Sequence, residues 1–351
     1  MAMLGSLALR QSSVDTTATP VETGQRIRLL YSIEHLPWFA RMYRGAFRSG
    51  SHKSAFSRIV HRALYYLSGS FGLPVGEGAI RLDVRGKPTT VRFDPLNRQF
   101  NVLYFDKYST AYEPEVSASI VELLPNDGVF YDIGSNWGYF SLLVATNPHF
   151  TGQVHAFEPW PSSYRDVKSL VEQTGLGEFV NCHSIALGER DERVSMECGR
   201  HSGLAHIVKS GGSTAIEQRS LDSVDLAPPC LIKMDAEGAE ISILLGAKRT
   251  LTKHKPMIVF EHNAGPSCKE HLDVLVYLEG LGYELFVPDV VWSETPGSSQ
   301  PIQLRLKPIT SGTRHQLGSY LNLFACHHSQ RDRLSRHLVE PQQTTPIAKA
   351  A

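Results

Sequence analysis

Within Phe130-Tyr-Asp-Ile-Gly-Ser-Asn-Trp-Gly-Tyr-Phe-Ser141, a hydrophobic strand ends and a helix begins. In an open parallel sheet, ligands bind at the carboxyl ends of strands, near the point where the strand order reverses. Gly134 and Gly138 can adopt backbone angles that other residues resist, and they let a ligand approach the main chain. The stretch therefore predicts a ligand-binding loop between a strand and a helix.

An acid in the right place indicates what kind of ligand this loop binds. Glu158 follows Gly138 by 20 residues, at the end of the next predicted strand. A carboxylate there can accept hydrogen bonds from both hydroxyls of a ribose. Asn136 replaces the glycine that would admit a pyrophosphate, and Asp132 would repel a pyrophosphate but attract the ammonium of a methionine moiety. The loop therefore favours an amino-acid-bearing nucleoside over a nicotinamide cofactor.

Strands and helices alternate around the loop. Upstream, residues 79–95 have the pattern of a β-hairpin and residues 113–124 that of an amphipathic helix. We expect strands at 129–132, 153–157, 180–186, 230–234 and 257–260, with a closing pair at 283–287 and 320–326. We expect helices at 139–146, 162–173, 239–251 and 269–281, and a strand-rich insertion at about 194–218. This alternation predicts an α/β fold with a mainly parallel sheet and helices on both faces.

Several short motifs together resemble one known family. They are Asp132-Ile-Gly-Ser-Asn-Trp-Gly138, Ala156-Phe-Glu-Pro159, Ala186-Leu-Gly188, Ser220-Leu-Asp222 and Ile232-Lys-Met-Asp-Ala-Glu-Gly-Ala-Glu240. In this order and spacing the chain resembles the FkbM-type S-adenosylmethionine-dependent methyltransferases over about residues 127–326. The resemblance implies a Rossmann-like class I methyltransferase fold, S-adenosylmethionine as the methyl donor, and methylation of an oxygen, often in a sugar or polyketide hydroxyl.

The same resemblance implies roles for individual residues. It places Asp235 at the end of the fourth strand, facing the methyl-transfer region and the cofactor. The other cofactor-binding positions that it implies are Asp132, Gly134, Asn136, Gly138 and Glu158. The match continues through Leu245-Gly-Ala247, Pro256 and Glu261.

The reactive end requires a group that deals with the proton of the methyl acceptor, and a base contributes roughly 10²–10⁴-fold to such a rate. Acids follow two predicted strands, whose ends share the sheet edge with the Gly134 loop. We expect Asp235 or His262 to be the base, with Glu261 orienting it. A less favoured alternative places Mg²⁺ between Asp235, Glu261 and Asn263. Other residues near these strand ends have plainer interpretations.

Glu240 is interpreted as an acid that complements the helix dipole, and Glu237 as either such an acid or a site residue. Lys233 should point away from the face that Ile232 and Met234 share, toward the substrate or a helix. The insertion at 188–218 is expected to shape the acceptor pocket.

Composition divides the chain and limits its partners. We expect residues 1–23 to be disordered, 24–78 to form a basic helical accessory segment, 79–328 the methyltransferase domain and 329–351 a flexible tail. Between residues 24 and 64 the only acid is Glu34, among many Arg and Lys. We favour a solvated basic face on helices that cap the main domain; the alternative is peripheral membrane contact.

Charge and cysteine content indicate which partners and which cellular compartment to expect. The chain has 35 basic and 35 acidic residues, so we expect no nucleic-acid partner. Its five cysteines are widely spaced and odd in number, which is typical of a reduced, cytoplasmic chain without disulfides or zinc. The apolar start lacks a preceding basic residue, so we expect no signal peptide.

The hypothesis from sequence is an O-methyltransferase that acts on a hydroxyl of a small molecule or glycan. An N-methyltransferase is the alternative in substrate chemistry. The alternatives in class are a non-catalytic nucleoside-binding interaction module and a nicotinamide oxidoreductase, which Asp132 and Asn136 disfavour.

Overall fold

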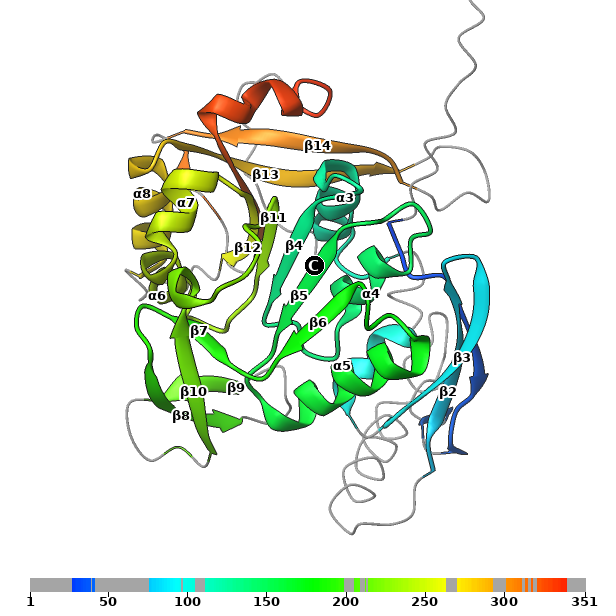
Figure 1. Ribbon diagram of the computed structural model, residues 1–351. Coiled ribbons are helices and arrows are strands. Elements are labelled where there is room, and N and C mark those ends of the chain that lie inside the picture. The colour runs from blue at the N-terminus through cyan, green and yellow to red at the C-terminus, as the bar shows by residue number, and fades with distance from the viewer. Residues whose placement is uncertain are drawn as a thin grey trace, which may run out of the picture.

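An eight-stranded sheet forms the centre of the protein (Figure 1). The computed structural model describes residues 27–38, 40–41, 76–95, 97–104, 111–198, 205–208, 212, 214–262, 270–292, 301–310, 313–314, 317 and 321–339. The strands of the sheet are β4 (Val129–Ile133), β5 (Gln153–Phe157), β6 (Val180–His183), β11 (Leu231–Met234), β12 (Met257–His262), β13 (Tyr283–Trp292), β14 (Pro301–Ile309) and β15 (Leu321–His327).

The strand order of this sheet is β14-β13-β15-β12-β11-β4-β5-β6. The five strands from β6 to β12 pair in parallel, and β15, β13 and β14 then add antiparallel pairs. The chain runs outward from β4 to β6 and then returns to place β11 on the other side of β4, so the order reverses between β4 and β11. The predicted mainly parallel α/β sheet is confirmed, and its switch point lies at the loop after β4.

Helices cover both faces of the sheet, as the alternation predicts. One face packs against α3 (Pro114–Leu123), α4 (Tyr139–Ala145) and α5 (Pro161–Thr174), and the other against α6 (Glu240–Gly246), α7 (Lys248–His254) and α8 (Glu270–Gly280). In β4, Phe130 enters the first core with Leu142 of α4, whereas Tyr131 enters the second core with Ile243 of α6. Successive strand residues thus serve opposite cores, which explains why the strands are almost continuously apolar.

A smaller antiparallel sheet precedes this domain in the chain. It consists of β1 (Tyr31–His35), β2 (Gly78–Val84) and β3 (Lys87–Phe93), in that order. The predicted hairpin is confirmed: Arg85 and Gly86 form its turn with φ values of 53° and 82°. A two-residue hairpin turn of this kind requires positive φ at both positions, which glycine adopts without strain.

The expected helical character of residues 24–78 is wrong at β1. Tyr31–His35 pairs antiparallel with β2, and Tyr31 and Ile33 pack against the buried core. The spacing of the apolar residues there fits a strand as well as a helix. The strand forms because this segment can pair with the free edge of β2. Residues 42–75, and the expected disordered residues 1–23, lie outside the described part of the chain.

The structure contradicts the expected flexible tail over residues 329–339. A 3-10 helix, η6 (His328–Leu334), follows β15, and Leu334 is fully buried. Leu306 of β14 donates a backbone hydrogen bond to the carbonyl oxygen of His337 and accepts one from Val339. The chain is therefore anchored to β14 as far as Val339, and residues 340–351 lie outside the described part.

The strand-rich insertion predicted at about 194–218 is confirmed, and with β7 its strands form a third sheet that begins earlier, at Ala186. Its order is β7-β10-β8-β9, built from β7 (Ala186–Gly188), β8 (Glu192–Cys198), β9 (Ala205–Val208) and β10 (Thr214–Ser220). Two further 3-10 helices are η1 (Arg98–Leu103) and η4 (Leu221–Ser223).

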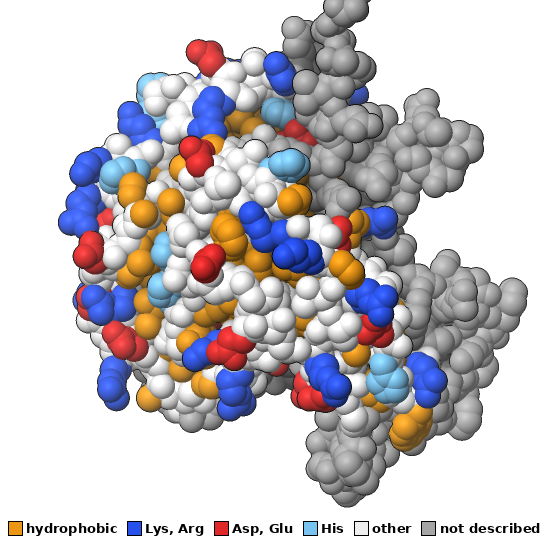
Figure 2. Space-filling model, turned by 45° about the vertical axis from the view of Figure 1, so that its right-hand side comes forward, with side chains coloured by type: hydrophobic (Ala, Val, Ile, Leu, Met, Phe, Trp, Pro, Cys, Tyr) orange, Lys and Arg blue, Asp and Glu red, His pale blue; other side chains and the backbone are white. Residues whose placement is uncertain are grey.

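The described surface is of mixed charge on the face that Figure 2 shows. Lys and Arg side chains there are interspersed with Asp and Glu side chains, without a broad patch of either sign. Among the described helices, none combines the length and apolar character that a membrane span needs.

The Arg85 side chain fastens the hairpin to the main domain. Its guanidinium lies 4.1 Å from the centre of the Phe179 ring. It also donates hydrogen bonds of 3.0–3.3 Å to the carbonyl oxygens of Ala145, Asn147, Pro148 and Phe150.

We expect Arg85→Ala to lower the free energy of unfolding by about 1–3 kcal/mol, because these carbonyl oxygens lose a charged donor. Arg92→Ala is the matched control, since Arg92 makes an exposed ion pair with Glu77 at 3.1 Å and such pairs contribute about 0–1 kcal/mol. Urea denaturation of both variants measures the difference. Equal losses would show that Arg85 does not fasten the hairpin.

Candidate active site

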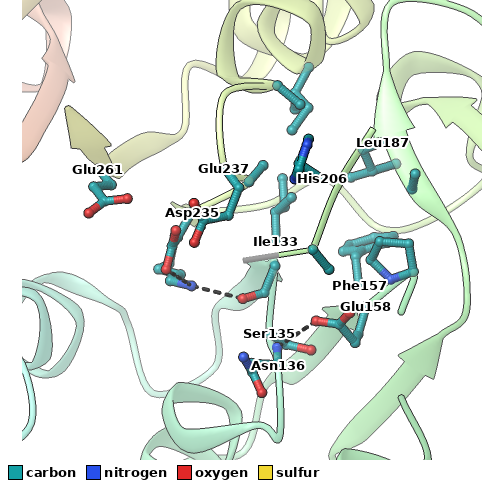
Figure 3. Close-up of a pocket in the computed structure, with 18 of the residues that line it drawn as sticks. Ile133, Ser135, Asn136, Phe157, Glu158, Leu187, His206, Asp235, Glu237 and Glu261 are labelled. Atoms are coloured by element: carbon teal, nitrogen blue, oxygen red, sulfur yellow. Dashed lines mark hydrogen bonds and ion pairs between the residues drawn. The ribbon is translucent and has the colours of Figure 1, made fainter. Parts of the chain in front are cut away.

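A pocket of about 240 Å³ opens at the carboxyl edge of the main sheet. Its walls come from the loop after β4, the ends of β5, β11 and β12, the start of α3, and β8 and β9 of the insertion. In Figure 3, Asp235, Glu237 and Glu261 lie on one side of the pocket, and Glu158 and Asn136 lie on the other. The pocket therefore lies at the switch point, where this class of sheet binds ligands.

Glycines at two positions let the loop after β4 fit between its neighbours. Gly134 has a φ of 69°, and a Cβ atom there would overlap the carbonyl oxygen of Asp235. Gly138 has a φ of 89°, and a Cβ atom there would overlap Val167 of α5. The backbone N–H of Gly134 also donates to the carbonyl oxygen of Phe157 at 3.0 Å. The positive φ of both glycines and their close approach to the Asp235 backbone and the Val167 side chain explain why glycine is needed at these positions.

Glu158 lies at the end of β5 and lines the pocket. Its carboxylate accepts hydrogen bonds from the backbone N–H groups of Asn136 at 2.8 Å and Trp160 at 2.7 Å. Burial nevertheless raises the pKa of Glu158 to about 7, because these bonds only partly offset the loss of solvent. Ser135 Oγ and Asn136 Oδ1 are buried without a hydrogen-bond partner. Together these groups fit a polar ligand such as a ribose.

Lys233 is a buried cation beneath the loop, 5% exposed. Its Nζ donates to the carbonyl oxygen of Gly134 at 3.0 Å and lies 3.5 Å from Asp235 Oδ2 and 3.7 Å from Asp132 Oδ1. Burial alone would lower the pKa of Lys233, but the carboxylates of Asp235, Asp132 and Glu113 outweigh burial and raise it. Lys233 therefore stays charged and links the loop to the end of β11.

Asp132 is fully buried and does not line the pocket. Its Oδ2 accepts hydrogen bonds from Ser141, from the backbone N–H at 3.0 Å and the hydroxyl at 2.7 Å. Burial raises the pKa of Asp132, and Lys233 and Ser141 oppose that effect. Asp132 thus anchors α4 and lies beside Lys233, and its contact with a ligand stays a prediction. Gly138, at the start of α4, does not line the pocket either.

The structure separates the two neighbours on β12. Glu261 lines the pocket, whereas His262 is 3% exposed and does not line it. Successive strand residues point to opposite faces, so a pocket-facing Glu261 directs His262 away. This placement argues against His262 as the base.

Of the remaining predicted acids, two line the pocket and one caps a helix. Asp235 and Glu237 line the pocket, and partial desolvation in the pocket wall, followed by repulsion from Asp235, raises the pKa of Glu237 to about 7 although much of its side chain is exposed. Glu240 instead accepts hydrogen bonds from the backbone N–H groups of Ala236 and Gly238, at 3.0 and 3.3 Å. Its interpretation as a helix N-terminal acid is confirmed, since it lies in the first turn of α6.

The pocket contains one acid that the sequence patterns did not single out. Glu113 precedes α3, far from the motifs in sequence, yet lines the pocket with Lys233 and Asp235. The only signal for it in the sequence is an acid before Pro114, where a helix begins.

The Mg²⁺ alternative requires several oxygen ligands that converge on one point. Among the described residues, no group of three or more His, Cys, Asp or Glu side chains is arranged to hold a metal ion. Asn263, one of the three suggested ligands, lies outside the described part of the chain.

Comparisons with known proteins give one domain match. Residues 126–285 match the family model of the methyltransferase FkbM domain. No curated protein matches the chain. Among solved structures, the chain is similar to a methyltransferase FkbM from Methylobacillus flagellatus KT, with 16% identity, a TM-score of 0.37, and coverage of 78% of this chain and 72% of that chain.

A second similar structure is a SAM-dependent O-methyltransferase from Thermotoga maritima, with 12% identity, a TM-score of 0.34, and coverage of 71% of this chain and 77% of that chain. At these TM-scores the structural likenesses carry no weight. The assignment rests on the domain match and on the geometry of the pocket.

We expect Lys233→Met to lower the free energy of unfolding by about 3–5 kcal/mol, because it leaves the Asp132 carboxylate buried without its cation. Lys253→Met is the control: Lys253 is exposed on α7, and its replacement should change stability by less than about 0.5 kcal/mol. Adding Asp132→Asn to Lys233→Met should recover part of the loss. Equal stability of the two lysine variants in urea denaturation would contradict this account.

Proposed function

We propose that the chain, whose residues 126–285 match the methyltransferase FkbM domain, is an S-adenosylmethionine-dependent methyltransferase that acts on a hydroxyl of a small molecule or glycan. Its strand order and two-faced helix packing are those of a Rossmann-like class I methyltransferase fold. The observation that carries the proposal is the pocket at the switch point, with Glu158 at one end and a group of carboxylates at the other.

The nucleoside end of the pocket fits the methyl donor. Glu158 would accept hydrogen bonds from the ribose hydroxyls, and Ser135 Oγ and Asn136 Oδ1 offer further polar groups that lack partners within the protein. S-adenosylmethionine carries a net positive charge, and Lys233 is the sole Lys or Arg among the described lining residues, against several acids. The charge of the pocket therefore favours a cationic ligand over a pyrophosphate.

The opposite end fits a methyl acceptor with a proton to lose. S-adenosylmethionine supplies an electrophilic methyl group on its sulfonium, so the protein must align the acceptor oxygen with that methyl and manage its proton. Asp235 and Glu261 line this end and can accept a hydrogen bond from an acceptor hydroxyl. Lys233, 3.5 Å from Asp235, holds that carboxylate in place. We therefore assign Asp235 and Glu261 to positioning the acceptor.

Affinity for S-adenosylhomocysteine should depend on the ionisation of Glu158. Ribose hydroxyls donate to the carboxylate and favour its ionised form, whereas in the free protein the pKa of Glu158 is about 7. Below pH 7 the carboxyl must lose a proton on binding, so affinity should fall by up to about tenfold per pH unit, and it should level off above pH 7.

Isothermal titration between pH 5.5 and 8 measures this dependence, and Glu158→Gln should flatten it. At pH 8, Glu158→Ala should weaken binding by about 1–3 kcal/mol, since buried ribose hydroxyls lose their acceptor. Absence of binding by the folded wild-type protein would refute the cofactor assignment. If Glu158→Gln keeps the pH dependence of the wild-type protein, the ribose does not bind at Glu158.

The acceptor can be found by incubating the protein with methyl-labelled S-adenosylmethionine and an extract of the native host. We expect a labelled ether in a small molecule or glycan. Asp235→Asn keeps the shape of the side chain and removes its charge, so it should lower kcat by at least about tenfold with little change in cofactor affinity. A label on nitrogen would replace the hydroxyl proposal with N-methylation.

A further inference from the structure

Glu113 lies outside the residues that match the FkbM domain, in an unusual backbone conformation. Its φ and ψ of 41° and 69° are left-handed, which is rare for a residue other than glycine. Pro114 follows it at the start of α3 and disfavours the right-handed helical region for Glu113. The carbonyl oxygen of Glu113 accepts a hydrogen bond from Ser117 at 2.9 Å, so the helix begins there. This conformation places a half-buried side chain in the wall of the pocket.

Charged groups from several elements surround the Glu113 carboxylate. Lys233 and Asp235 lie at the end of β11, and Glu261 lies at the end of β12. Glu115 is on α3 itself, and Tyr139 comes from α4, where Glu113 contributes to its raised pKa. These interactions place Glu113 at the Asp235 end of the pocket, where the acceptor is proposed to bind.

Glu113 differs from the neighbouring acids in having no competing partner. In the described part of the chain, no group donates a hydrogen bond to its carboxylate, and no ion pair within 4.0 Å is formed. Asp235 is paired with Lys233, Glu158 accepts two backbone N–H groups, and Glu115 accepts Asn322 Nδ2 at 3.0 Å. Glu237 lines the pocket but is exposed to solvent. Glu113 thus combines access to the pocket with a lone pair that the protein leaves unused.

We infer that Glu113 is the catalytic base that takes the proton of the acceptor hydroxyl during methyl transfer, an inference that rests on the proposed function. The acceptor oxygen forms its bond to the methyl carbon while the bond between that carbon and the sulfonium breaks. The electron pair of the broken bond goes to sulfur, which becomes the neutral thioether of S-adenosylhomocysteine. The hydroxyl proton goes to the carboxylate of Glu113, so charge and atoms balance.

The proton affinity of Glu113 suits this step. Burial first, and then Asp235, raise its pKa to about 8; Lys233 opposes them, and Glu115 and Glu261 add to the rise. A base with a pKa near the working pH is an efficient proton acceptor. The nearby sulfonium lowers that pKa while the methyl donor is bound, which favours the ionised base. Transfer removes the positive charge from sulfur, so the proton affinity of Glu113 recovers as the proton arrives.

The first test needs no acceptor. S-adenosylmethionine and S-adenosylhomocysteine differ by the charged methyl, so only the former should drive a proton off Glu113. Isothermal titration at pH 7.5 in buffers of different ionisation enthalpy should show that S-adenosylmethionine releases roughly half a proton more per site than S-adenosylhomocysteine. Glu113→Gln should abolish this difference, whereas Glu122→Gln, an exposed acid on the same helix, should preserve it. A difference that survives in Glu113→Gln overturns the inference.

The second test uses the labelled product from the host extract. Glu113→Gln should reduce kcat by about 10²–10⁴-fold, and Glu122→Gln should leave it unchanged. Because the base acts when ionised and the bound donor lowers its pKa, kcat should rise with pH and level off below pH 8, and this rising limb should disappear in Glu113→Gln. Near-wild-type kcat in Glu113→Gln overturns the inference. A labelled amine contradicts the hydroxyl proposal alone, because the proton-release experiment still reports on Glu113. Thermal unfolding of each variant establishes that it is folded.

Discussion

The active-site loop depends on one buried cation. Lys233 comes from β11, yet it bonds to the carbonyl oxygen of Gly134 in the loop after β4 and lies between the carboxylates of Asp132 and Asp235. A buried charge is tolerated only with such partners, and a buried carboxylate only with such a cation. The two central strands are therefore coupled electrostatically as well as by their backbone ladder. The position of the loop, and with it the shape of the pocket, follows from this arrangement.

The charges around Lys233 give the two ends of the pocket different chemistry. The carboxylate of Glu158 accepts hydrogen bonds from the backbone N–H groups of Asn136 and Trp160, and it can also accept them from ligand hydroxyls. At the other end, Asp235 is paired with Lys233, whereas Glu113 has no ion pair in the described part of the chain, and burial raises its pKa to about 8. One group of acids can thus serve binding, positioning and proton transfer, because each acid has a different set of neighbours. Burial alone would raise the pKa of every one of these carboxyl groups.

Local pattern predicted most of the sheet, because alternating apolar strands and amphipathic helices repeat over residues 129–281. It also predicted the positions of the loop and of Glu158, because each comes directly after a predicted strand, where a glycine or an acid stands. It could not predict β1, whose strand conformation depends on the distant edge of β2. The sequence patterns also did not predict the direction of individual side chains. Asp132 points into the core and contacts Ser141. Glu261 lines the pocket, whereas its neighbour His262 does not. Glu113 enters the site only through the docking of α3.

We propose that a nucleoside lies along this pocket, with its ribose at Glu158 and its sulfur toward Asp235 and Glu113. A crystal structure of the protein with S-adenosylhomocysteine would establish this placement. We expect both ribose hydroxyls within hydrogen-bond distance of the Glu158 carboxylate, and the sulfur atom between Glu158 and the carboxylates at the other end. A nucleoside bound outside this pocket, or one whose ribose lies against Asp235, would refute the proposed placement.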